Sequence, residues 1–181
     1  MGLIAIPGTD GTLTPPSRER RAIFRMKVLA AAQASRAEEA LGGDPNREEL
    51  PIVGNFDAAC GVCWGACCAY GGNAAFISGA TVRRLRNARP ELSDADIVEH
   101  YVNAIPEQTV ENSCILHGQG GCALPREQRS SICNDFWCRP VKDWRRNEVT
   151  REQARPVAVV IVHENRATRS SIVTMDPRAR L

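Results

Sequence analysis

CGVCWGACC (residues 60–68) and CILHGQGGCALPREQRSSICNDFWC (residues 114–138) are the stretches that decide the fold, because together they contain all eight cysteines of the chain. Structural cysteines that act as small buried hydrophobes would be spread along the sequence. Four cysteines between positions 60 and 68 are instead close enough to converge on one inorganic centre. The sequence therefore indicates a cofactor before it indicates a reaction.

The sequence favours reduced thiols over disulfides, because we find no export signal in it. The first residues carry no positive charge before a short apolar stretch, and Pro7 and Gly8 interrupt that stretch, so we expect no signal peptide. The longest apolar run, Val157–Val162, is far shorter than the roughly 20 residues that cross a bilayer. We expect a cytoplasmic protein without a membrane partner, in which metal ligation is favoured over disulfides. The disulfide alternative would require an export route.

Thiolates are soft ligands that select zinc, copper(I) or iron–sulfur clusters, and four of them complete a zinc site or a four-iron cluster. Eight cysteines suffice for two such sites. Cys67 and Cys68 are adjacent, so one is expected in each site or one is an unligated thiol. Only Cys60 and Cys63 have zinc-knuckle spacing, which gives a slight preference for iron–sulfur over zinc.

Residues around the cysteines are candidates for a supporting role. A tetrathiolate centre keeps a net negative charge, so nearby cations are expected to donate hydrogen bonds toward it. His117 is an alternative ligand, because it lies between two cysteines. The candidate cations are Arg126, Arg129 and Arg139, and the aromatic residues expected to exclude water are Trp64, Phe136 and Trp137.

The 181 residues predict an α+β, mainly helical fold with a small cysteine-rich, metal-centred domain. A long helix is expected over Arg18–Leu41, with Ser17 as its N-cap and two glycines after it. Two shorter helices over 78–89 and 93–104 form a predicted hairpin that brings the cysteine groups together; Ser93 and Asp96 resemble a capping box. The expected parts are an extended arm (1–16), an N-terminal helix and loop (17–55), the cysteine-cluster domain (56–140) and a packed C-terminal segment (141–181).

The C-terminal segment is expected to contain a short helix over Trp144–Gln153 and then a β-hairpin. Its strands are predicted over Val157–Val162 and Ser171–Thr174, with the turn near Asn165.

Three classes of function fit these observations. The favoured class is a metal-binding protein whose centre is structural or transfers electrons, as an accessory to a protein partner. The second is a cluster-dependent redox or modification enzyme, but the chain has no G-x-G-x-x-G loop and no identifiable nucleophile–base pair, so independent catalysis is not expected. The third is a zinc-stabilised nucleic-acid or protein interaction module that uses the basic C-terminal third of the chain, although this part lacks an interleaved stripe of aromatic and basic residues.

The order of motifs resembles the YkgJ-type cysteine-cluster proteins, a family described as a zinc- or iron-chelating domain with a CxxCxxCC signature. The resemblance covers about residues 56–140. This chain departs from the signature in having three residues between Cys63 and Cys67. The resemblance implies metal chelation by eight residues: Cys60, Cys63, Cys67, Cys68, Cys114, Cys122, Cys133 and Cys138.

Overall fold

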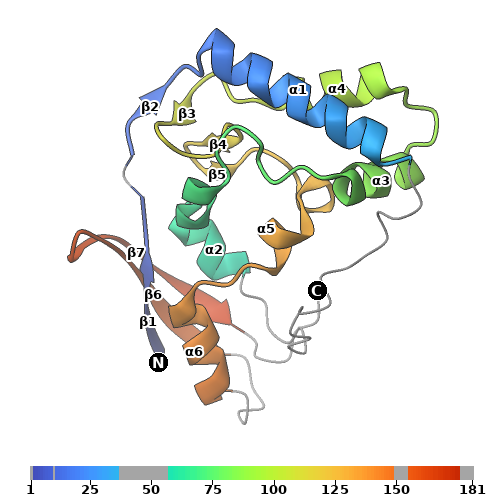
Figure 1. Cartoon of the computed structure of the whole chain (residues 1–181). Helices are drawn as coiled ribbons and strands as arrows, with labels where there is room; N and C mark the ends of the chain where they lie inside the picture. The colour runs from blue at the N-terminus through green and yellow to red at the C-terminus, as the bar shows by residue number, and fades with distance from the viewer. Residues whose placement is uncertain (1, 10, 37–56, 149–154, 176–181) are drawn as a thin grey trace. The chain divides into compact units, whose positions relative to one another are not determined.

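The computed structural model describes residues 2–9, 11–36, 57–148 and 155–175, and its secondary structure is α+β (Figure 1). The chain forms two compact units. The sheet unit combines Met1–Asp10, Asn46–Ala66 and Trp137–Leu181. The helical unit combines Gly11–Pro45 and Cys67–Phe136. Among the described helices, none has both the length and the apolarity needed to cross a bilayer.

The sheet unit is built on three strands in the order β1-β6-β7. Strand β1 (Gly2–Pro7) pairs in parallel with β6 (Arg155–His163), which pairs antiparallel with β7 (Arg166–Met175). Alternate residues of β1 and β6 face the core of the unit, as the two-residue period of a strand requires. Helix α6 (Arg139–Glu148) contributes Val141 and Trp144 to this core, and α2 (Asp57–Cys63) contributes Ala59.

The predicted C-terminal hairpin is confirmed. Its turn consists of Glu164 and Asn165, which both have positive φ angles, 46° and 65°. Two such residues make a type I′ turn, whose twist matches that of the paired strands. The predicted helix before the hairpin begins earlier than expected, at Arg139, and residues 149–153 of that prediction lie outside the described residues.

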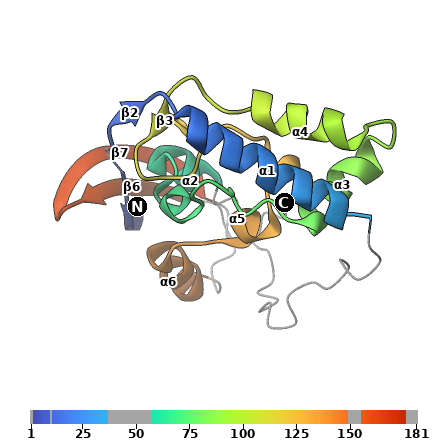
Figure 2. The ribbon, with the colours of Figure 1, turned by 45° about the horizontal axis from the view of Figure 1, so that its top comes forward.

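The helical unit is organised around α1 (Arg18–Ala34), α3 (Gly79–Ala88) and α4 (Asp94–Asn103). Figures 1 and 2 show α3 and α4 beside α1, which contacts both. The buried face of α1 presents Phe24 and Val28 to the same core as Val82 of α3 and Tyr101 of α4. The two predicted short helices are confirmed, and each packs on α1.

Serine caps begin all three helices. Ser17, Ser78 and Ser93 each accept a hydrogen bond from a backbone N–H in the first turn. Asp96 completes the predicted capping box by accepting the Ser93 N–H at 3.0 Å. Each cap acts on N–H groups within the next three residues, so a helix start can be predicted from the sequence around it.

Helix α1 ends at Ala34 with Ser35 as its C-cap, earlier than the predicted end at Leu41; residues 37–41 of that prediction lie outside the described residues. The Ser35 hydroxyl donates to the Ala32 carbonyl at 2.6 Å, and the Ser35 side chain is itself buried. From α3, Arg83 donates to the Ser35 carbonyl at 3.0 Å and Arg86 to the Ala32 carbonyl at 3.4 Å. The last carbonyl groups of the helix are therefore satisfied by side chains from a neighbouring helix.

The expected parts of the chain do not coincide with the two units. The arm, residues 1–16, contributes β1 to the sheet unit, while Leu13–Thr14 forms β2, which pairs with β3 (Thr109–Val110) in the helical unit. The expected cysteine-cluster domain, residues 56–140, is divided after Ala66 and after Phe136. The physical reason is that Ala59, Trp137 and Cys138 pack with the strands β1, β6 and β7.

Short elements of the helical unit position the cysteines. They are a 3₁₀ turn η2 (Ala66–Tyr70), strands β4 (His117–Gly118) and β5 (Gly121–Cys122), a second 3₁₀ turn η3 (Arg126–Gln128) and helix α5 (Ser131–Asp135).

Candidate metal centre

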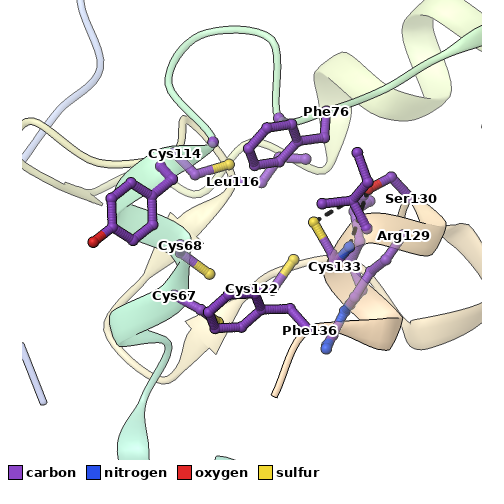
Figure 3. Close-up of a pocket in the computed structure, with 15 residues that line it drawn as sticks. Cys67, Cys68, Phe76, Cys114, Leu116, Cys122, Arg129, Ser130, Cys133 and Phe136 are labelled. Atoms are coloured by element: carbon purple, nitrogen blue, oxygen red, sulfur yellow. Dashed lines mark hydrogen bonds between the residues drawn. The ribbon is translucent and has the colours of Figure 1, made fainter. Parts of the chain in front are cut away.

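Five cysteines line one cavity of the helical unit, and Figure 3 shows them around a common space. The cavity has a volume of about 280 Å³. The five cysteines are Cys67, Cys68, Cys114, Cys122 and Cys133. The last two cysteines of the first sequence group are thus brought together with the first three of the second group.

Backbone hydrogen bonds join the segments that carry Cys68 and Cys114. The Cys68 carbonyl accepts the N–H of Cys114 at 3.0 Å and the N–H of Gly71 at 3.0 Å. Gly71 lies so close to Cys114 that a Cβ at position 71 would come within 2.8 Å of both the Cβ and the Sγ of that cysteine. Position 71 therefore requires glycine, because any larger residue would overlap the Cys114 side chain.

Cys122 is positioned by the β4–β5 hairpin, in which it pairs with His117. The imidazole of His117 is buried, and its Nδ1 lies 2.7 Å from the Ser113 hydroxyl. His117 is not among the residues that line the cavity. The structure therefore gives this histidine a packing position beside the cysteines, in contrast to the alternative in which it is a ligand.

Cys133 lies in the first turn of α5, where Ser130 caps the helix by accepting the Cys133 N–H at 3.3 Å. The Ser130 hydroxyl also donates to the Cys133 sulfur at 3.3 Å, as the dashed lines in Figure 3 indicate. Ser130 is not among the site residues predicted from the sequence. The spacing Ser-x-x-Cys, which places a cap three residues before a thiol, is the signal that would have found it.

Arg129 is the cation that lines the cavity, and its Nε donates to the Leu124 carbonyl at 2.8 Å. The other two predicted cations have different surroundings. Arg126 donates to the Asn134 carbonyl at 3.3 Å, which ties η3 to α5. Arg139 belongs to the sheet unit, where its largely exposed side chain lies 3.5 Å from the Asp143 carboxylate.

The cavity wall is mostly apolar. Of the three predicted shielding residues, Phe136 lines the cavity, whereas Trp64 and Trp137 belong to the sheet unit. The other apolar side chains of the wall, which were not predicted from the sequence, come from several segments: Tyr70, Ala75, Phe76, Leu116, Leu124 and Ile132. An apolar wall keeps water from thiolates and strengthens their electrostatic interactions.

The adjacent pair Cys67 and Cys68 has opposite pKa shifts. The pKa of Cys67 is lowered to about 7, first because its sulfur accepts a hydrogen bond from Cys68, while the charge of Arg129 makes a smaller contribution. The same hydrogen bond, with burial, raises the pKa of Cys68 far above its usual value. The two thiols titrate as a coupled pair, which loses one proton near neutral pH and keeps the other.

Burial dominates the remaining thiols of the cavity. It raises the pKa of Cys114 to about 12 and also raises the pKa of Cys133, although the Ser130 hydrogen bond opposes the shift at Cys133. A metal that binds these thiols must therefore displace protons, as thiolate ligation generally requires.

The flanking cysteines lie in the sheet unit. Cys63 and Cys138 pack against its core, and the Cys63 thiol donates to the Pro7 carbonyl at 3.3 Å. The side chain of Cys60 lies outside the described residues. None of the seven described cysteines forms a disulfide.

We expected one metal-centred domain that contains all eight cysteines. In the structure, the cysteines are divided between the two units. Among the described side chains, no three His, Cys, Asp or Glu residues converge on one point as the ligands of a single ion would. The arrangement is a thiol-lined cavity.

No family model, curated protein or solved structure matches this chain. The resemblance to YkgJ-type proteins therefore stays a prediction that rests on the cysteine motifs.

Proposed function

We propose that the helical unit binds a thiolate-ligated metal centre in the cavity formed by its five cysteines, with an iron–sulfur cluster preferred over zinc. The observation that carries this proposal is the meeting of five thiols from four separate segments around one cavity of about 280 Å³. Structural thiols need no such convergence. Cysteine sulfur is the ligand that soft metals and iron–sulfur clusters select.

The residues around the thiols fit such a centre. Four thiolates around zinc(II) or a cubane core leave a net negative charge, which Arg129 partly balances from the cavity wall. Ser130 donates a hydrogen bond to the Cys133 sulfur, as supporting groups of metal–thiolate sites do. Gly71 leaves room for the Cys114 thiol.

The cavity volume of about 280 Å³ leaves room for a multi-atom cluster. Tetrahedral zinc with Zn–S bonds of about 2.3 Å holds its four sulfur atoms roughly 3.8 Å apart. The described thiols surround a cavity and do not converge on one point.

A bound iron–sulfur cluster would supply one-electron transfer, and zinc would supply a structural cross-link. In either case this chain provides the thiolates, the apolar wall and the balancing charge. A structural or electron-transfer role as an accessory to a protein partner follows as part of the proposal. The cytoplasmic location and the partner stay predictions, as does metal binding by Cys60, Cys63 and Cys138.

The test is anaerobic purification of the full chain, followed by metal analysis and a visible absorption spectrum. Stoichiometric iron with a sulfide-to-iron charge-transfer band is the expected result, and stoichiometric zinc without visible absorption would select the alternative metal. Cys122→Ser should lose most of the metal. Cys63→Ser in the sheet unit is the matched control and should retain it.

A wild-type chain that carries neither iron nor zinc, or a Cys63→Ser variant that loses metal as completely as Cys122→Ser, would overturn the assignment to the five-cysteine cavity.

A further inference from the structure

The three-stranded sheet has two faces with different surroundings. Its inner face carries buried residues such as Ile4 and Val159, which share a core with residues of α2 and α6. Because side chains alternate along a strand, the residues between these point to the opposite side, here called the outer face. The pairing register places nine residues of the outer face in three cross-strand rows: Leu3, Ala158 and Ile172; Ala5, Val160 and Ser170; Pro7, Val162 and Ala167.

The outer face is apolar and uncharged. Ser170 is the one polar residue among the nine, and none of them is ionisable, although 24% of the residues in the chain are charged. Leu3 and Ile172, at the two edges of the face, are 69% and 65% exposed. The part of the chain that the structure describes therefore leaves this apolar face open to solvent. Uncharged apolar patches of this kind mark interaction sites.

The strands themselves have the sequence pattern of a sheet that is covered on both faces. Strands β1 and β6 pair in parallel, and parallel strands occur almost always in sheets whose two faces are both buried. Residues 3–6 and 157–162 are unbroken apolar runs, whereas a strand with one face in water alternates apolar and polar residues. Helices α2 and α6 cover the inner face, so the pattern requires a second cover on the outer face.

Charge and area indicate what that cover is. It must be uncharged, because a charged group buried against these rows would have no partner there. A second copy of the chain meets this condition, since it brings the same three uncharged rows, and two sheets pack face to face about 10 Å apart. Three strands about 4.8 Å apart, over six residues of about 3.3 Å each, span roughly 280 Å². Stable interfaces bury about 800 Å² per partner, so this contact is a weak one.

We propose that the outer face is a self-association surface, through which two copies of the chain pack sheet against sheet in a weak, reversible dimer. The contact is isologous, because the same rows of both copies meet across a two-fold axis. Each sheet is then covered on one face by its own helices and on the other by the second sheet. The contact involves no cysteine and no metal, so it is independent of the proposed function.

Sedimentation equilibrium of the full chain, from low to high micromolar concentration, measures this association. A thiol reductant is present throughout, so that disulfides between copies do not contribute. The wild type should show a monomer–dimer equilibrium. Ser170→Lys adds a charge to the outer face of both copies and should raise the dissociation constant at least about tenfold. Ser171→Lys is the matched control, because Ser171 is also exposed but pairs with Val159 of the inner face. Its dissociation constant should equal that of the wild type.

Two results would overturn the proposal. A wild-type chain that stays monomeric at the highest concentration has an outer face that something other than a second copy covers. A dimer that Ser170→Lys leaves intact, or that both lysine variants weaken equally, forms through another surface. Ile172→Lys, in a different row of the outer face, is a second variant and should weaken the dimer as Ser170→Lys does. Circular dichroism establishes that each variant is folded.

Discussion

Gly71 lies directly against Cys114, since a Cβ at position 71 would come within 2.8 Å of both the Cβ and the Sγ of that cysteine. The nearest atoms belong to a buried side chain whose backbone is tied to Cys68, so they have little freedom to move. This contact makes the glycine a determinant of where the Cys114 thiol lies.

Gly71→Ala should therefore destabilise the chain and displace Cys114. We expect a loss of about 1–3 kcal/mol in the free energy of unfolding, the usual cost of overpacking, measured by urea denaturation. Gly120→Ala is the matched control in the same unit, because nothing lies within 4 Å of its added Cβ. Equal stability of the two variants would contradict the predicted contact.

Ser130→Ala should destabilise helix α5 and raise the pKa of Cys133. Loss of an N-cap costs about 0.5–2 kcal/mol in general, and loss of the hydroxyl donor should raise the pKa of Cys133 further. The pKa is measured from the pH dependence of Cys133 alkylation in the metal-free chain, read by mass spectrometry. Ser131→Ala, one residue further along, should leave the profile unchanged. An unaltered Cys133 profile in Ser130→Ala would show that the hydrogen bond has no influence.

Cys67 should be alkylated with an apparent pKa of about 7 in the metal-free chain, because Cys68 donates a hydrogen bond to its thiolate. Cys68→Ala removes that donor and should move the pKa of Cys67 back toward its ordinary value of 9.0. Identical pH profiles for Cys67 in the wild type and in Cys68→Ala would refute this explanation.

The same pair predicts a pH dependence of stability in the metal-free chain. A folded-state pKa of Cys67 below its unfolded value contributes stability that is present above pH 9 and is lost as the pH falls toward 7. Cys68 has a raised pKa, so its contribution is present below pH 9 and declines above it. The free energy of unfolding should therefore increase from pH 7 to 9 and then decrease. Urea titrations across this range, compared with Cys67→Ser, provide the measurement.

Arg86→Ala should be more destabilising than its position on a short helix suggests. Arg86 donates to Asp94 at 2.6 Å and to the carbonyl groups of Ala32 and Leu92, so its loss removes one donor from each of these three partly buried acceptors. We expect a loss of about 1–3 kcal/mol in thermal or urea unfolding. Arg89→Ala, which removes an exposed ion pair with Glu91, should cost less than about 1 kcal/mol. A smaller effect at Arg86 than at Arg89 would contradict the role of Arg86 at the end of α1.

Local signals explain which elements could be predicted. Ser17 and Ser93 mark helix starts because a cap acts on N–H groups only two or three residues away. Asn165 marks the hairpin because the turn needs residues that tolerate a positive φ. The end of α1 could not be predicted in this way, since Arg83 and Arg86 reach it from another helix.

By itself, the sequence determined the α+β composition, the helix starts, the hairpin and the presence of two dense groups of cysteines, because each depends on residues close together in the chain. Only the tertiary structure decided which cysteines meet. It assigns Cys67 and Cys68 to one cavity, although their adjacency suggested that they serve separate sites or that one of them is unligated. It assigns Cys63 and Cys138 to the sheet unit. Spacing along the chain cannot determine this division, because it depends on which core buries the segments that flank each thiol.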